Sequence, residues 1–118
     1  MTELKVYHYP GCRKSREGLQ YLRDSGAAFT VLEYMKTPLT FKDMERLLVK
    51  LDMKPAGLIR TGEDYYKQHL KGKHFEDHEL IRIMLENPRL IRRPVVEGPY
   101  RAVIGDPPEN IARLLEKR

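Results

Sequence analysis

The sequence predicts an α/β domain built on a mixed four-stranded sheet. Three observations support this prediction: a strand–helix–strand pattern over residues 4–34, helical patterns over residues 40–87, and two late apolar runs separated by a Gly-Pro turn. The strands of a strand–helix–strand unit run parallel with a right-handed crossover, whereas the strands of a hairpin run antiparallel. The four strands are therefore expected to form one sheet with both kinds of pairing.

The N-terminal third has the signals of the strand–helix–strand unit. Residues 4–8 alternate as a short strand. Residues 15–25 have the leucine spacing of an amphipathic helix, and Gly26 stands where a helix commonly ends. Residues 29–34 alternate and contain enough β-branched residues to form a second strand.

The middle of the chain is expected to be helical. Thr40 is a candidate N-cap, and Asp43 adds a carboxylate to the first turn of its helix. Pro55 is expected to open a shorter helix, and residues 63–70 a further one. Residues 77–85 give the clearest helical pattern of this block.

The C-terminal part combines a hairpin with a helix. The apolar runs 95–96 and 102–104 flank a turn that contains glycine and proline, and residues 109–116 have the pattern of a final helix. This order of elements is the layout of a thioredoxin-like fold. Residues 1–118 are then a single domain, in which residues 40–87 form a helical insertion.

The composition narrows the class of protein. With 41% hydrophobic and 33% charged residues, the 118-residue chain suits one folded domain. No apolar run approaches the roughly 18–20 residues of a membrane helix, and the N-terminal residues lack the layout of a signal peptide. A single cysteine excludes an internal disulfide, so a cytoplasmic protein without a membrane partner is expected. The net charge of +5 fits a small anion, and no nucleic-acid-binding motif accompanies it, so no direct nucleic-acid partner is expected.

Cys12 is the candidate catalytic residue. It lies between a strand and a helix, where unpaired backbone N–H groups and the positive end of the helix dipole face the sulfur. The neighbouring Arg13, Lys14 and Arg16 favour the nucleophilic thiolate, so the pKa of Cys12 is expected below about 8.5. Ser15 is expected to direct its hydroxyl to the sulfur or to cap the helix. The alternative is that Cys12 is a small buried apolar residue.

The Cys-x-x-Ser pattern lacks a second thiol. An adduct of Cys12 therefore needs an outside thiol for its release, such as glutathione or glutaredoxin. An oxyanion attacked by Cys12 is best held by guanidinium groups. Arg60 follows a short apolar stretch, and Arg93 stands before Pro94 and a buried-looking pair of valines. These two arginines are the candidates to hold it, and the alternative is that both are solvated on the surface.

Four segments resemble motifs of a known family. Residues 8–16 (HYPGCRKSR) resemble the His-x-Pro-x-Cys-x-x-Ser-Arg motif of the glutaredoxin-coupled arsenate reductases, the ArsC-type family of the thioredoxin-like superfamily. Residues 33–38 (EYMKTP) are similar to its Tyr-x-x-Thr-Pro segment and residues 57–60 (GLIR) to its Leu-x-Arg motif. Residues 87–96 (NPRLIRRPVV) are similar to its Asn-Pro-x-Leu-Ile-x-Arg-Pro-Ile-Val stretch. The similarity covers nearly the whole chain.

The resemblance implies a role for each matching residue. Cys12 attacks arsenate, Arg60 and Arg93 hold the oxyanion and its adduct, glutathione is the co-substrate, and glutaredoxin releases arsenite. His8 supports the cysteine loop, with a purely structural strand residue as the alternative. Pro94 corresponds to a cis-proline beside that loop. No bound cofactor and no metal site are expected.

One position departs from the family pattern. Asp106 stands where the family's reductases carry a third arginine, and a carboxylate there repels a dianion. Arg101 is a candidate to compensate, whereas the alternative role for Asp106 is to cap the last helix. Two other functions therefore stay open: an Spx-like regulator that docks on RNA polymerase, and a monothiol protein with another substrate.

Overall fold

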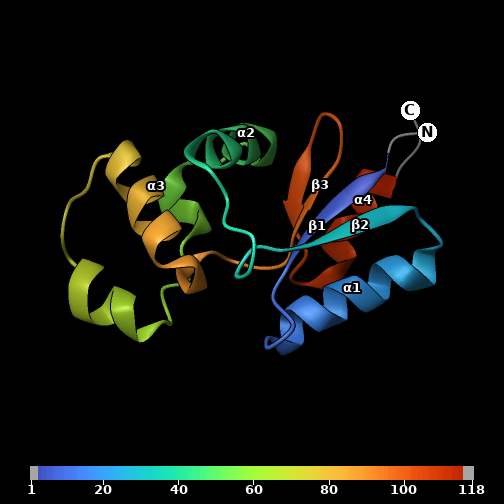
Figure 1. The fold of residues 1–118 in the computed structure, drawn as a ribbon, viewed down its shortest axis with the longest axis horizontal. Helices are drawn as coiled ribbons and strands as arrows, with labels where there is room; N and C mark the ends of the chain where they lie inside the picture. The colour runs from blue at the N-terminus through green and yellow to red at the C-terminus, as the bar shows by residue number, and fades with distance from the viewer. Residues whose placement is uncertain (1–2, 116–118) are drawn as a thin grey trace. The chain divides into compact units, whose positions relative to one another are not determined.

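The computed structural model describes residues 3–115. They divide into two compact units (Figure 1). The sheet unit contains the chain up to Thr37 and again from Arg93 onward, and the helical unit contains Pro38–Arg92. None of the helices within residues 3–115 is long and apolar enough to cross a membrane. The helical unit begins and ends within five residues of the predicted insertion, while the single-domain assignment stays a prediction.

The sheet unit contains the predicted mixed sheet, with strand order β2-β1-β3-β4. Strand β1 (Leu4–His8) pairs in parallel with β2 (Phe29–Glu33). On its other side β1 pairs antiparallel with β3 (Val95–Glu97), and β3 forms the predicted hairpin with β4 (Ala102–Ile104). The first strand is thus central, and its C-terminal end leads directly to Cys12.

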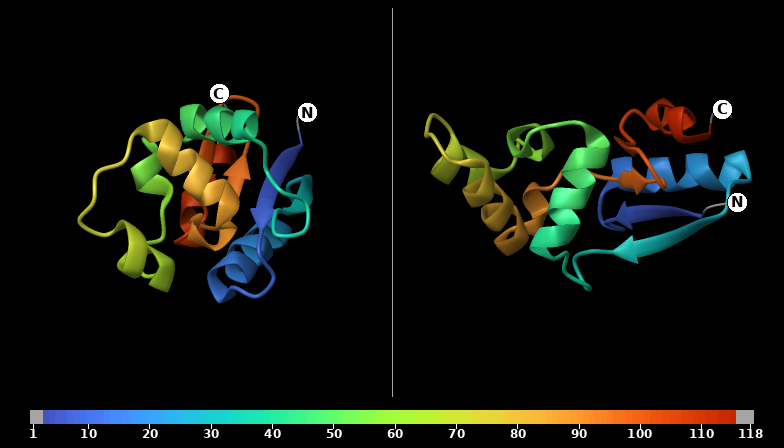
Figure 2. Two further views of the ribbon diagram at one scale, coloured as in Figure 1. Left: turned by 60° about the vertical axis from the view of Figure 1, so that its left-hand side comes forward. Right: turned by 90° about the horizontal axis from the view of Figure 1, so that it is seen from above.

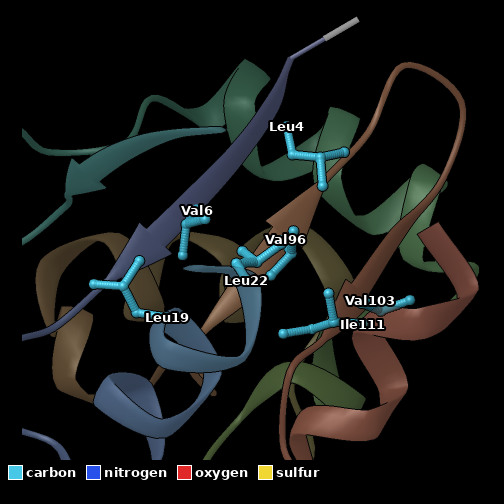
Figure 3. Packing of buried hydrophobic residues seen from close by; sticks show 7 residues of the cluster. All are labelled: Leu4, Val6, Leu19, Leu22, Val96, Val103 and Ile111. Atoms are coloured by element: carbon cyan, nitrogen blue, oxygen red, sulfur yellow. The ribbon is translucent and has the colours of Figure 1, made fainter. Parts of the chain in front are cut away.

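The helices of the sheet unit cover an apolar core. Helix α1 (Arg13–Ser25) ends at Gly26, whose left-handed φ of 77° confirms the predicted stop. The final helix differs from the prediction, because η4 (Pro108–Ile111) is a 3-10 turn and only α4 (Ala112–Leu115) is α-helical. Two consecutive prolines supply no N–H groups at this start, and the predicted Glu116 lies outside the described residues. The core side chains in Figure 3 come from both sheet and helices: Leu4, Val6, Leu19, Leu22, Val96, Val103 and Ile111.

Strand β1 is buried on both faces. Leu4 and Val6 face the core, and Tyr7, on the opposite face, is only 3% exposed. The Tyr7 hydroxyl donates a 2.6 Å hydrogen bond to Oε1 of the buried Glu97 on β3. This bond satisfies a buried polar group where a charge would otherwise be costly.

The helical unit confirms the predicted block of helices (Figure 2). Helix α2 (Phe41–Leu51) begins with a capping box in which the Thr40 and Asp43 side chains each accept the other's backbone N–H. The bounds of the remaining elements are η1 (Pro55–Leu58), a π-helical turn η2 (Tyr66–Leu70), α3 (Asp77–Glu86) and the 3-10 turn η3 (Pro88–Leu90).

Replacing Gly18 by alanine is predicted to destabilise the sheet unit. A Cβ on Gly18 would lie 2.6 Å from Cγ of Pro94 and 3.3 Å from the Gly105 carbonyl oxygen. A proline ring cannot rotate away, so overpacking of about 3 kcal/mol outweighs the gain in helix propensity of about 1 kcal/mol. Urea unfolding of Gly18→Ala should show a net loss of about 2 kcal/mol. Gly62→Ala is the control, since nothing lies within 4 Å of its added Cβ; equal stability of the two variants would contradict this packing.

Candidate active site at the start of helix α1

Cys12 is the N-cap residue of α1. Its backbone is extended, with φ −107° and ψ 123°, and its side chain is partly exposed. Its N–H donates a 3.1 Å hydrogen bond to the Tyr9 carbonyl, and its own carbonyl accepts the Arg16 N–H at 3.0 Å. These two bonds hold the cysteine in a tight turn between β1 and α1, as predicted, although the helix begins at Arg13 rather than at the predicted Ser15.

Opposing effects set the pKa of the Cys12 thiol. Burial raises it, since a thiolate loses hydration. The backbone N–H of Ser15, a hydrogen bond from the Arg93 side chain, the N–H of Lys14 and the Arg93 charge all lower it. The stabilising groups prevail, and the pKa lies below the ordinary value for cysteine. The direction agrees with the prediction, and the structure adds Arg93 as a cause that the sequence alone did not give.

The Ser15 side chain has a role that was not predicted. Helix α1 has no side-chain cap, and the fully buried Ser15 hydroxyl lies 2.8 Å from Nδ1 of His8 and accepts the Tyr9 N–H at 3.0 Å. It therefore fastens the end of β1 to the first turn of α1. The predicted role as a helix cap was wrong, because the hydroxyl is the partner of the polar groups of residues 8 and 9. The other predicted role, a hydroxyl directed to the sulfur, stays a prediction.

His8 is buried beneath the loop. Burial lowers its pKa most, Glu33 opposes the shift, and Arg23 and Arg16 reinforce it. Its imidazole is thus neutral at pH 7. Its Nδ1 can then accept a hydrogen bond from the Ser15 hydroxyl, while the hydroxyl oxygen accepts one from the Tyr9 N–H.

Arg93 is the arginine of the sheet unit that reaches the sulfur. It is only 6% exposed, and its guanidinium carbon lies 4.8 Å from the centre of the Tyr9 ring. The peptide bond that follows it, to the buried Pro94, is cis, as the resemblance implied. The alternative interpretation, in which Arg93 is solvated on the surface, was wrong. The Tyr9 ring contact was missed, because nothing in the sequence pairs residue 9 with residue 93.

Arg60 belongs to the helical unit. Its backbone N–H donates a 2.7 Å hydrogen bond to the Leu90 carbonyl, and Nη1 of its guanidinium lies 2.6 Å from Oε2 of Glu63. The same carboxylate also faces Arg89, 3.7 Å away. Arg60 is thus held by an acidic partner that the sequence analysis did not name, and its part in an oxyanion site stays a prediction.

Asp106 forms an ion pair instead of a helix cap. Its Oδ2 lies 3.1 Å from Nζ of Lys14 in the first turn of α1, whereas the residue before η4 is Pro107 and no side chain caps that turn. The cap interpretation was therefore wrong. Arg101 is not directed to this position either, because its Nη2 donates a hydrogen bond to the Arg113 carbonyl.

The fold and the site together define a class of protein. A free cysteine occupies the N-cap position of the helix that follows the first strand of a mixed sheet, a cis-proline lies against the same helix, and this arrangement is that of a thioredoxin-like thiol protein. The model of the ArsC family matches residues 7–114. The chain belongs to the ArsC family.

Similar proteins cover the chain almost completely. It is 37% identical to the uncharacterized protein YfgD of Escherichia coli (strain K12), over 96% of this chain and 97% of that protein. It is 34% identical to an arsenate reductase of Neisseria meningitidis, over 98% and 100% of the two chains. Two solved structures share its thioredoxin-like fold. A putative arsenate reductase from Yersinia pestis has a TM-score of 0.87 at 35% identity, covering 94% of this chain and 99% of that one. The arsenate reductase from Vibrio cholerae has 0.89 at 33%, covering 95% and 97%.

Alkylation of Cys12 is predicted to follow a thiolate of lowered pKa. The rate with iodoacetamide should reach half its maximum at a lower pH than for an ordinary cysteine, since thiolate is the reacting form. Arg93→Ala should move this midpoint to higher pH, because it removes a donor and a positive charge from the sulfur. Arg92→Ala is the matched control, since its guanidinium donates to the Gly57 carbonyl instead. Mass spectrometry measures the rate, and an unmoved midpoint in Arg93→Ala would contradict the contact.

Proposed function

We propose that this protein reduces arsenate, with Cys12 as the nucleophile and with glutathione and glutaredoxin as reductants. The observation that carries the proposal is the Cys12 thiol, which is partly exposed at a helix N-terminus and whose pKa is lowered by the Ser15 N–H and by the buried Arg93. The ArsC family implies an oxyanion substrate, and several relatives are named arsenate reductases. A thiolate beside a guanidinium suits attack on such an anion.

The proposed reaction balances with one cysteine. The Cys12 thiolate forms an S–As bond to arsenate, and an oxygen leaves as water after protonation. Glutathione replaces a second oxygen on the arsenic(V) adduct. A glutaredoxin thiolate then attacks the glutathione sulfur, and the bond between arsenic and that sulfur breaks and leaves its electron pair on arsenic. Arsenic(V) becomes arsenic(III), two thiols become a mixed disulfide, and hydrolysis releases arsenite and Cys12.

The surrounding residues take distinct parts in this proposal. Arg93 stabilises the thiolate before attack and the oxygens of the adduct after it. His8 and Ser15 position the cysteine loop through the buried hydroxyl. Pro94 packs against helix α1 at Gly18, so closely that a Cβ on Gly18 would lie 2.6 Å from its Cγ. Arg60 is proposed as the second oxyanion ligand, which requires its guanidinium to exchange Glu63 for the substrate.

Asp106 lowers the positive charge that meets the anion. Its carboxylate neutralises Lys14, a cation two residues after Cys12, so the pair adds no net charge to the site. The substrate therefore meets a neutral ion pair rather than an isolated carboxylate. This supports turnover with a weakened affinity for dianions rather than its abolition.

Arsenate-dependent oxidation of NADPH, coupled through glutathione reductase, glutaredoxin and glutathione, tests the proposal. The wild type should turn over, and Cys12→Ser should fall to background because a serine hydroxyl does not ionise near pH 7. Arg93→Ala should lose roughly 10- to 150-fold in kcat/KM, the equivalent of a charge-assisted hydrogen bond of about 1.5–3 kcal/mol. Arg92→Ala serves again as the control.

The outcomes separate the alternatives. Turnover in Cys12→Ser would show a different nucleophile. A wild type without turnover, but with a reactive Cys12, would favour another thiol substrate. Copurification with RNA polymerase subunits would favour the docking function.

Asp106→Arg is predicted to strengthen anion binding. The substitution removes a negative charge, adds a positive one and releases Lys14 from its ion pair. Protection of Cys12 from alkylation by arsenate should then require a lower arsenate concentration, and the effect should shrink with added salt. Asp24→Arg is the control, because it makes the same change of charge near the far end of α1. Equal protection in both variants would remove Asp106 from the site.

A further inference from the structure

We propose that Tyr9 is a positioning residue whose ring holds the guanidinium of Arg93 beside Cys12 and thereby tunes the thiolate and the oxyanion site. The proposal deepens the proposed function, on which its oxyanion part rests. Tyr9 is the aromatic residue of the cysteine loop, and the proposed reaction gives its side chain no role.

The backbone of Tyr9 is held on both sides. Its N–H donates to the buried Ser15 hydroxyl at 3.0 Å, and its carbonyl accepts the Cys12 N–H at 3.1 Å. These two bonds fix the direction in which its side chain leaves the loop. The ring therefore has a defined place relative to the sulfur of Cys12, three residues further along the same loop.

Gly11 makes room for the ring. A Cβ on Gly11 would lie 3.0 Å from Cζ and 3.1 Å from the hydroxyl oxygen of Tyr9, closer than side-chain contacts normally come. The Tyr9 ring thus folds back over its own loop instead of extending into solvent. Residues 9 and 11 form a matched pair, in which the small residue permits the position of the large one.

The buried cation of Arg93 lies over the Tyr9 ring. Arg93 is 6% exposed, and its guanidinium carbon lies 4.8 Å from the ring centre, within the range of a cation–π interaction. Burial of a charge requires compensation, and the aromatic ring beneath the cation provides part of it. The ring accepts no conventional hydrogen bond, so it leaves the N–H groups of the guanidinium to the sulfur or to an oxyanion.

Matched variants separate the ring from its hydroxyl. Tyr9→Phe keeps the aromatic face, and Tyr9→Leu keeps apolar bulk without it. Gly11→Ala keeps the tyrosine but displaces its ring by the added Cβ. Two quantities are measured on each full-length protein: the pH midpoint of Cys12 alkylation and the concentration of inorganic phosphate or arsenate that halves the alkylation rate.

Tyr9→Phe should match the wild type in both measurements. Tyr9→Leu should move the alkylation midpoint to higher pH and weaken anion protection by roughly 3- to 30-fold, the range of a partly desolvated cation–π contact. Gly11→Ala should change both quantities in the same direction by less, since its Cβ displaces the ring only slightly. In an Arg93→Ala background, Tyr9→Leu should have no further effect, since the two residues act through one contact. Circular dichroism confirms that each variant is folded.

Three results would overturn the proposal: Tyr9→Leu and Gly11→Ala that both behave as the wild type, a Tyr9→Phe variant as impaired as Tyr9→Leu, or additive effects with Arg93→Ala. If the anions protect no variant, the wild type included, the oxyanion function fails. The alkylation midpoints then still decide whether Tyr9 acts on Arg93. If protection is strong and equal throughout, the oxyanion function stands and the role of Tyr9 is refuted.

Discussion

The buried Ser15 hydroxyl is the interaction on which the active-site loop depends. It joins His8, the last residue of β1, to the first turn of α1, and it satisfies the Tyr9 N–H in the same place. Without it two buried polar groups would lose their partner, at a cost of about 1–3 kcal/mol each. The loop would then be free to relax, and the N–H groups that face the Cys12 sulfur would no longer be held in one direction.

A rigid loop makes a reactive thiolate compatible with partial burial. Burial alone raises the pKa of Cys12 and would leave an unreactive thiol, so the lowering must come from dipoles and charges aimed at the sulfur. The helix start supplies N–H dipoles, and Arg93 supplies a positive charge. Both are fixed before any substrate arrives, so in the proposed reaction the site needs little reorganisation when the negative charge moves from sulfur to an oxyanion.

The sequence predicted the features that depend on local chemistry. Alternation gave the strands, Gly26 the end of α1, and Thr40 with Asp43 the capping box. The side-chain partners that join residues distant in sequence were beyond its reach. Arg93 lies over Tyr9 only because β3 pairs with β1, and no local pattern records that pairing. The ion pair of Asp106 depends in the same way on the approach of the last loop to α1.

The Lys14–Asp106 pair shows how the site can change without a change of fold. Lys14 has 56% and Asp106 32% of its side chain exposed, and such ion pairs contribute little to stability, about 0–1 kcal/mol. Their effect on a bound anion is larger, because a dianion interacts with every charge near it while the fold does not depend on them. A carboxylate at this position therefore alters the charge at the proposed oxyanion site while leaving the thiolate, the Ser15 bonds and the sheet as they are. Affinity for an anion can thus diverge within the family independently of thiol reactivity.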